Sequence, residues 1–303
     1  MNTSRRIFIK NSSLTIAGVS LLPELFQQKS SNVILAVQLY SVRDDMKKDP
    51  AGTLKKLANI GYKYVEHAGY ENRKFYGYAI SDFKKLLGDT GLKMDSGHSS
   101  LGSGQWDKSA NDFTDEWKYT IEDAAAVGMK YVISPGVDES LCKSMDDFKH
   151  YLDMFNKSGE LCKRSGIHFA FHNESYEFNH NLEGKSIYDL ILQRTDKNLV
   201  AQQMDIGNMY EPGGRALFFL KKYPGRFKLL HVKDEMKNNK PAENGNVYVN
   251  TVLGKGVLDV KEIIDYARNS GTEYFIIEQE QYQDKTPLEC ADIDYKKMKG
   301  WGF

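Results

Sequence analysis

Four short apolar segments of this sequence end abruptly in residues that can bind a metal ion or transfer a proton. The endings are His172-Asn173-Glu174, Asp205, His231-Val232-Lys233-Asp234 and Glu278-Gln279-Glu280. Imidazole and carboxylate groups together suit Mn²⁺, Co²⁺ or Zn²⁺ better than Ca²⁺, which prefers oxygen ligands alone. Because helical segments separate the four endings, we expect them to meet in one site.

Two earlier segments have similar polar endings. Glu66 and His67 end one of them, and His98 ends the next. We expect these three residues to contact a substrate, together with the aromatic ring of Tyr40. Structural explanations stay open beside the functional ones. A buried histidine can simply bind a backbone carbonyl, an aspartate can cap a helix, and a strand-end glutamate or lysine can face solvent.

The order of elements indicates how these residues are positioned. Predicted strands cover residues 33–40, 64–67, 92–98, 131–134, 167–171, 199–204, 226–232 and 274–277, and helical segments lie between them. Glycines stop the helices before the strands, at Gly61, Gly91, Gly128, Gly166 and Gly271. Eight such units predict a single closed (β/α)₈ TIM barrel over residues 31–303, with the strand C-termini on one face. A doubly wound open sheet is the alternative, although no glycine-rich phosphate loop follows the first strand.

Composition excludes several classes of protein. Hydrophobic residues make up 41% of the chain and charged residues 27%, and the formal net charge is zero. No basic stripe with interleaved aromatic residues is present, so a nucleic-acid partner is not expected. The three cysteines are far apart and form no CxxC pair, which argues against disulfides and a thiolate zinc site. Nothing in the sequence indicates the oligomeric state.

The N-terminal segment has a different character. Ser4-Arg5-Arg6-Ile7-Phe8-Ile9-Lys10 precedes an apolar stretch over residues 14–26. This arrangement resembles a twin-arginine export signal, which predicts a periplasmic protein with a signal segment over residues 1–30. The apolar stretch is too short for a stable membrane span. A basic start to an ordinary amphipathic helix is the alternative.

Several motifs resemble the sugar phosphate isomerase/epimerase family of xylose isomerase-like barrels. They are the stretches at 171–178, 204–206 and 221–234, with Gln38-Leu39-Tyr40-Ser41-Val42-Arg43-Asp44 and Gly254-Lys255-Gly256-Val257-Leu258-Asp259. The resemblance implies one divalent metal, Mn²⁺ first and Co²⁺, Zn²⁺ or Mg²⁺ as alternatives. It implies Asp205, His231 and Glu278 as ligands, with His172 favoured over Glu174 as the fourth. Asn208 stands where relatives with more metals carry a histidine, which favours a single ion.

The implied chemistry is proton removal beside the carbonyl group of a sugar or glycoside, through an enediolate held by the metal. Glu278 and Glu174 are the candidate bases, and Lys233 could hold the enediolate oxygen. Return of the proton elsewhere gives an isomerase or epimerase. Expulsion of a β-substituent gives a lyase or dehydratase acting on keto-sugars or 3-keto-glycosides. A non-catalytic carbohydrate-binding barrel is the third alternative, and export favours sugars without phosphate.

Overall fold

The structure is a computed structural model that describes residues 33–238 and 247–303. Its central feature is a closed barrel of eight parallel strands. The strands are β1 (Ile34–Gln38), β2 (Tyr64–His67), β6 (Lys93–His98), β9 (Tyr131–Pro135), β10 (His168–His172), β13 (Val200–Asp205), β14 (Phe227–Val232) and β17 (Tyr274–Ile277). Consecutive barrel strands pair with one another, and β17 closes the ring by pairing with β1. The predicted (β/α)₈ barrel is confirmed, and the open sheet is excluded. The expected signal segment lies outside the described residues.

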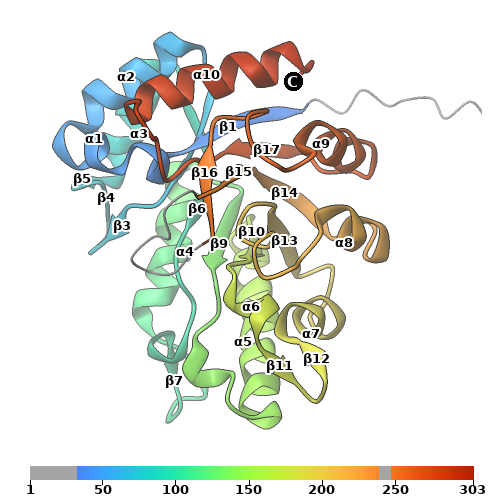
Figure 1. The fold of residues 1–303 in the computed structure, drawn as a ribbon. Coiled ribbons are helices and arrows are strands. Elements are labelled where there is room, and N and C mark those ends of the chain that lie inside the picture. Colours follow the sequence, from blue (N-terminus) through green and yellow to red (C-terminus); the bar gives the residue numbers. More distant parts are fainter. Residues whose placement is uncertain (1–32, 239–246) are drawn as a thin grey trace, which may run out of the picture. The chain divides into compact units, whose positions relative to one another are not determined.

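Helices connect the strands and surround the barrel (Figure 1). They are α1 (Arg43–Lys48), α2 (Pro50–Ile60), α3 (Ile80–Thr90), α4 (Asp115–Val127), α5 (Met145–Arg164), α6 (Tyr176–Asn179), α7 (Ile187–Arg194), α8 (Ala216–Lys222), α9 (Val260–Asn269) and α10 (Pro287–Gly300). Short 3₁₀ turns occur at η1 (Leu39–Val42), η2 (Ser103–Gln105) and η3 (Glu139–Leu141). The C-terminal helix α10 packs beside α2, next to the seam where the barrel closes (Figure 1).

Local sequence signals explain where several helices begin and end. The Asp49 carboxylate accepts a hydrogen bond from Gly52 N–H, and Pro50 occupies the first turn of α2. Gly91 ends α3 at φ 72°, in the left-handed region that side chains rarely adopt. Helix α3 begins at Ile80, after Ala79, without a side-chain cap.

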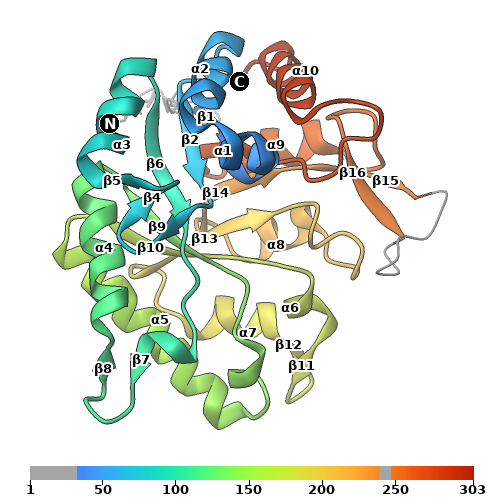
Figure 2. The same cartoon turned by 90° about the vertical axis from the view of Figure 1, so that its left-hand side faces the viewer.

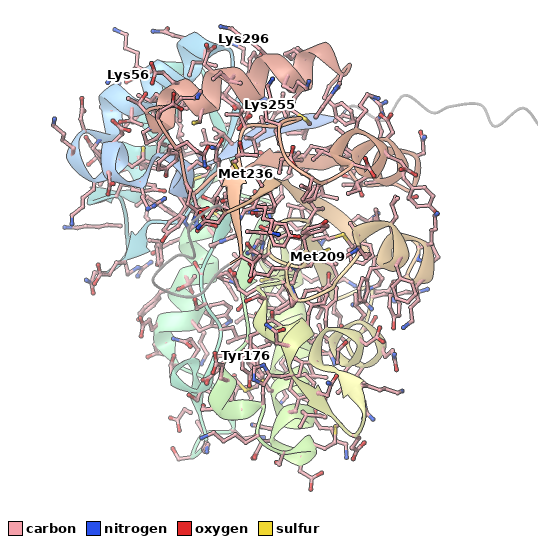
Figure 3. All side chains as sticks on the ribbon, viewed as in Figure 1. Lys56, Tyr176, Met209, Met236, Lys255 and Lys296 are labelled. Atoms are coloured by element: carbon pink, nitrogen blue, oxygen red, sulfur yellow. The ribbon has the colours of Figure 1, made fainter. Side chains whose placement is uncertain are left out.

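Two apolar layers stabilise the barrel. The inner layer packs near the strand N-termini and contains Ala36, Tyr131, Ile133, Ala170, Leu229, Tyr274 and Ile276. The outer layer lies between strands and helices and includes Phe169 and Phe171, which alternate with Ala170 along β10. Figure 3 shows side chains filling the space between the elements. This packing leaves the opposite end of the barrel interior for polar residues.

Small antiparallel strands follow four of the barrel strands at their C-terminal ends. They are β3 (Tyr70–Glu71), β4 (Lys74–Phe75) and β5 (Tyr78–Ala79) after β2; β7 (Trp106–Asp107) and β8 (Asp112–Phe113) after β6; β11 (Asn181–Leu182) and β12 (Lys185–Ser186) after β10; and β15 (Asp234–Lys237) and β16 (Tyr248–Thr251) after β14. Figure 2 shows β15 and β16 projecting from the barrel. In the part of the chain that the structure describes, no helix is both long and apolar enough to cross a membrane.

Candidate metal centre

Asp205, His231 and Glu278 lie together inside the barrel at the C-terminal end of its strands. One potential ligand atom from each lies within 4.8 Å of the others, and all three residues are buried. The Nδ1 atom of His231 is 2.8 Å from Glu278 Oε2 and 3.5 Å from Asp205 Oδ2. Asp205 is the last residue of β13, His231 lies in β14, and Glu278 directly follows β17. Three neighbouring strands therefore supply a compact group of metal-binding side chains.

The fifth barrel strand, β10, brings two further residues to this group. The Nε2 atom of His172 lies 3.8 Å from Asp205 Oδ2 and 3.6 Å from Glu174 Oε1. His172 is fully buried, whereas the Glu174 side chain is 48% exposed. Glu174 also accepts a hydrogen bond from Asn208 Nδ2 at 2.7 Å. A buried imidazole directed at Asp205 fits a ligand better than a partly solvated carboxylate that is already bonded to an amide.

Glu66 lies on the inner side of the site. Its Oε1 accepts hydrogen bonds from His231 Nε2 at 2.6 Å and Gln38 Nε2 at 2.9 Å. Its Oε2 accepts from Ser96 Oγ at 2.5 Å and Gln203 Nε2 at 2.8 Å. The Glu66 side chain is completely buried, so we place it beneath His231 as a hydrogen-bond partner. The contact of Glu66 with a substrate stays a prediction.

Gln203 determines which nitrogen atoms of the neighbouring histidines carry protons. Its amide nitrogen must face the Glu66 carboxylate, which only accepts hydrogen bonds. Its Oε1 therefore accepts from His98 Nε2 at 2.8 Å and from His172 Nδ1 at 2.9 Å. With Nδ1 protonated, neutral His172 presents a bare Nε2 to Asp205. His231 donates from Nε2 to Glu66; burial opposes its positive charge, but the carboxylates of Glu278 and Glu66 hold its pKa well above the ordinary value. A metal ion would therefore have to displace the proton on Nδ1, the atom that faces Asp205 and Glu278.

The Lys233 ammonium is buried among oxygen atoms beside the same group. Its Nζ lies 3.1 Å from Asp205 Oδ2, 2.9 Å from Glu278 Oε2 and 2.6 Å from Glu280 Oε1. It also donates to Asn208 Oδ1 at 3.0 Å. The alternative of an exposed lysine is thus excluded. With its donors occupied by these oxygens, Lys233 balances the carboxylate charges of the site.

The charges of the site depend strongly on one another. Burial alone would raise the pKa of Asp205, but the nearby Lys233 ammonium and the histidines lower it to about 2. Burial likewise opposes ionisation of Glu278, and Lys233 and His231 hold its pKa well below the ordinary value. The pKa of Glu66 is also well below normal, because His231 and His98 outweigh burial. The carboxylates are therefore ionised and ready to bind a cation.

The residues of this site fit a divalent metal ion. Among the described residues, Asp205 Oδ2 is buried without a hydrogen-bond partner, although Lys233 Nζ is nearby. Asp205, His231, Glu278 and His172 would provide two carboxylates and two imidazoles. His98, His172 and His231 form a second group of suitable spacing. In that group, however, His98 Nε2 and His172 Nδ1 both bind Gln203 Oε1, which favours the group around Asp205.

A polar cavity of about 460 Å³ opens next to the site. It is lined by Glu174, Ser175, Asn179, Gly207, Asn208, Glu211, Pro212, Glu235, Tyr248, Asn250, Glu280 and Gln281. These residues follow β10, β13, β14 and β17, the same strands that carry the candidate ligands. Burial raises the pKa of Glu235 to about 8, since nearby Lys233 only partly offsets it. The cavity has a volume in the range of small-molecule binding sites.

Two residues expected at the site lie elsewhere. His67 packs edge-on against Phe75, and its ring fills the space beside Gly97, where even a Cβ would clash. Successive strand residues point to opposite faces, so Glu66 faces the interior and His67 the outer layer. Tyr40 is 43% exposed and lines a separate hollow with Arg43 and Tyr76. His98 does reach the interior, stacked on His231 at 5.3 Å between ring centres.

Sequence reasoning gave no individual role to four residues of this region: Gln38, Gln203, Glu235 and Glu280. A signal was present for Gln203, which lies two residues before Asp205 on the same face of β13. Glu280 stands two residues after Glu278 in the same way. Gln38 and Glu235 have no such signal, because their partners Glu66 and Asn250 are distant in sequence.

The chain is similar to known proteins over most of its length. Residues 54–296 match the family model described as xylose isomerase-like TIM barrel. An inosose dehydratase of Clostridium perfringens is 29% identical over 177 residues, 55% of this chain and 59% of that protein. One from Bacillus thuringiensis is 26% identical over 149 residues, 45% of this chain and 48% of that protein. The chain thus spans about half the length of these curated relatives.

Solved structures give a similar result. Two crystal structures of sugar phosphate isomerase/epimerase proteins from Parabacteroides distasonis superpose with a TM-score of 0.76 each. They are 25% and 27% identical, and the match covers 89% and 88% of this chain and 95% and 98% of theirs. The IolI protein, whose structure contains a zinc atom, has a TM-score of 0.66 at 13% identity over 89% of this chain and 98% of that chain. At that identity it shares the fold alone.

Proposed function

This chain belongs to the xylose isomerase-like TIM barrel family, and from that premise we propose that it is a metal-dependent sugar isomerase or epimerase. The observation that carries the proposal is the buried group Asp205, His231 and Glu278 beside a polar cavity. A divalent ion at this group, with Mn²⁺ as the first choice, would act as a Lewis acid toward a sugar carbonyl and acidify the adjacent C–H.

Glu174 is the residue best placed to move the proton. Its carboxylate lines the cavity, and Asn208 fixes one of its oxygen atoms. Removal of the proton beside the carbonyl leaves an enediolate. Return of the proton to the neighbouring carbon gives an isomer, and return of the proton to the opposite face of the same carbon gives an epimer. Glu278 is the second candidate base, but its carboxylate is bonded to His231 and Lys233.

A dehydratase is the second candidate function, supported by the similarity to inosose dehydratases. The same enediolate would lose a hydroxyl group from the carbon β to the original carbonyl, and the hydroxyl would leave as water after protonation. Glu235 lines the cavity, and burial raises its pKa to about 8, so it retains a proton at neutral pH for this step. Isomerase and dehydratase would thus share the first half of the reaction.

One assay distinguishes these functions. The protein is loaded with Mn²⁺ and incubated with free sugars and 3-keto-glycosides in deuterated water, and NMR follows each carbon. Deuterium beside the carbonyl with a rearranged sugar indicates an isomerase or epimerase, whereas loss of water indicates a dehydratase. EDTA should stop the exchange. Turnover that survives complete metal removal would refute the proposal, and sugar binding without any exchange would identify a carbohydrate-binding barrel.

We also propose that the protein is exported to the periplasm. The support is the twin-arginine pattern from Ser4 to Lys10, which lies outside the described residues.

A further inference from the structure

We propose that the cavity selects uncharged sugars or glycosides and rejects phosphate esters, an inference that rests on the function proposed above. Among the described residues, the cavity lining contains four glutamates, Glu174, Glu211, Glu235 and Glu280, and no lysine or arginine. Proteins bind phosphate groups with arginine or lysine side chains and with backbone N–H groups at helix N-termini. The lining described here carries carboxylates in place of such positively charged groups.

The positively charged groups described near the cavity are either paired with carboxylates or bonded to backbone carbonyl oxygens. The Lys233 ammonium lies 2.6 Å from Glu280, so this pair is neutral. A divalent ion held by Asp205 and Glu278 would be neutralised by those two carboxylates. Arg215, in the loop before α8, stacks over Tyr210 and donates to the carbonyl oxygens of Tyr210 and Gly214. The first two cations are thus paired with carboxylates, and Arg215 is not among the residues that line the cavity.

Among the described residues, two of these carboxylates have no lysine or arginine within ion-pair distance. Glu174 accepts a hydrogen bond from the neutral Asn208 amide. Glu211 accepts from the backbone N–H groups of Val247 and Tyr248, at 3.1 Å each. Even with Glu235 protonated, a bound phosphate dianion would meet two negative charges. At a separation of roughly 8 Å, each would weaken binding by about tenfold or more, and the pair by about 100-fold.

The other groups of the lining suit hydroxyl groups. Within the described residues, the Ser175 hydroxyl, the Asn179 amide and the Tyr248 hydroxyl line the cavity with no hydrogen-bond partner in the protein. Carboxylate oxygens such as those of Glu174 accept hydrogen bonds from sugar hydroxyls without a charge on the ligand. The cavity thus combines neutral donors with acidic acceptors, as a polyhydroxylated, uncharged ligand requires.

Matched pairs of substrates test this inference. Free ketohexoses and 3-keto-glucosides are each offered beside their terminal phosphate esters, and deuterium exchange is measured with the Mn²⁺-loaded protein. We expect kcat/KM for the free sugar to exceed that for the ester by about 100-fold at low salt. Added salt should narrow the difference, because it screens the repulsion. Faster exchange with the esters would overturn this inference and leave the proposed function standing. No exchange with any pair would overturn both.

A single variant then tests the source of the discrimination. Glu211→Gln removes one charge and keeps an oxygen that can accept one of the two backbone N–H groups of the β16 hairpin, while its NH₂ group faces the other. Its preference for the free sugar should fall about tenfold. The control is Glu160→Gln, the same change on the exposed side of α5, which should leave the preference unaltered. An unchanged preference in Glu211→Gln, or an equal fall in Glu160→Gln, would contradict the assignment.

Discussion

Glu66→Gln should weaken metal binding although Glu66 lies beneath the ligands and does not belong to them. The substitution keeps the shape of the side chain but replaces one acceptor oxygen by an NH₂ donor. All four hydrogen bonds to Glu66 come from donors: His231, Gln38, Ser96 and Gln203. The new NH₂ group must therefore face at least one of these donors, and the network has to rearrange.

Both possible orientations of the new amide disturb the metal site. If its NH₂ faces His231, Nε2 must accept, and the imidazole proton moves to Nδ1, the atom that faces Asp205 and Glu278. If its NH₂ faces Gln203, that amide must turn, and His172 loses the acceptor at 2.9 Å that keeps its Nε2 bare. Loss of such a supporting hydrogen bond lowers metal affinity by about 10–100-fold, or about 1.4–2.7 kcal/mol.

Competition with a fluorescent chelator measures this change directly, with Mn²⁺ and Zn²⁺ titrated separately. Glu160→Gln provides the matched control on the surface, and thermal unfolding in EDTA verifies that Glu66→Gln still folds. We expect weaker binding of both metals with one ion per chain. An affinity within twofold of the unsubstituted protein would refute the reasoning that Glu66 sets the protonation of His231.

Three further predictions follow from other parts of the chain. His172→Ala should lower metal affinity more than about 100-fold, whereas Glu174→Gln should abolish proton exchange and leave the affinity nearly unaltered; chelator competition and NMR compare them, and the reverse pattern would exchange the two roles. Burial raises the pKa of Asp294 to about 7, so its protonated form stabilises the fold at low pH and this contribution is lost as pH rises toward 7. Relative to Asp294→Asn, the protein should lose about 3 kcal/mol of unfolding free energy between pH 5 and pH 8, measured by urea unfolding. If the unfolding free energies of the two proteins changed in parallel with pH, this prediction would be contradicted. Replacing Arg5 and Arg6 by lysine should retain the protein in the cytoplasm, as cell fractionation would show, and continued export would reject the signal.

The sequence predicted the barrel because its signals are local. Five helices stop at or next to a glycine, and most strands contain a short apolar run, so their order alone indicates eight repeated units. Asp205 and Glu278 were recognisable because each ends such a run next to the polar end of the barrel. These features need no knowledge of which strand residues face inward.

The faces of individual strands could not be predicted in the same way. Glu66 and His67 both lie in buried surroundings, since a barrel strand is covered on both sides, and nothing in the run Tyr64–His67 distinguishes the faces. The pairing of β2 with β6 also shifts in register between Val65 and Glu66. Distant partners such as Gln38 for Glu66 become visible only when the barrel is closed.

The bond between His231 and Glu66 joins residues that are 165 positions apart, on β14 and β2. Glu278 comes later still, directly after β17, the strand that closes the ring against β1. A growing chain therefore contains Glu66, which supports the site, long before it contains Glu278, the last of the candidate ligands. No partly synthesised barrel can bring Asp205, His231 and Glu278 together, so a metal ion could be bound by all three only after β17 has been made and docked.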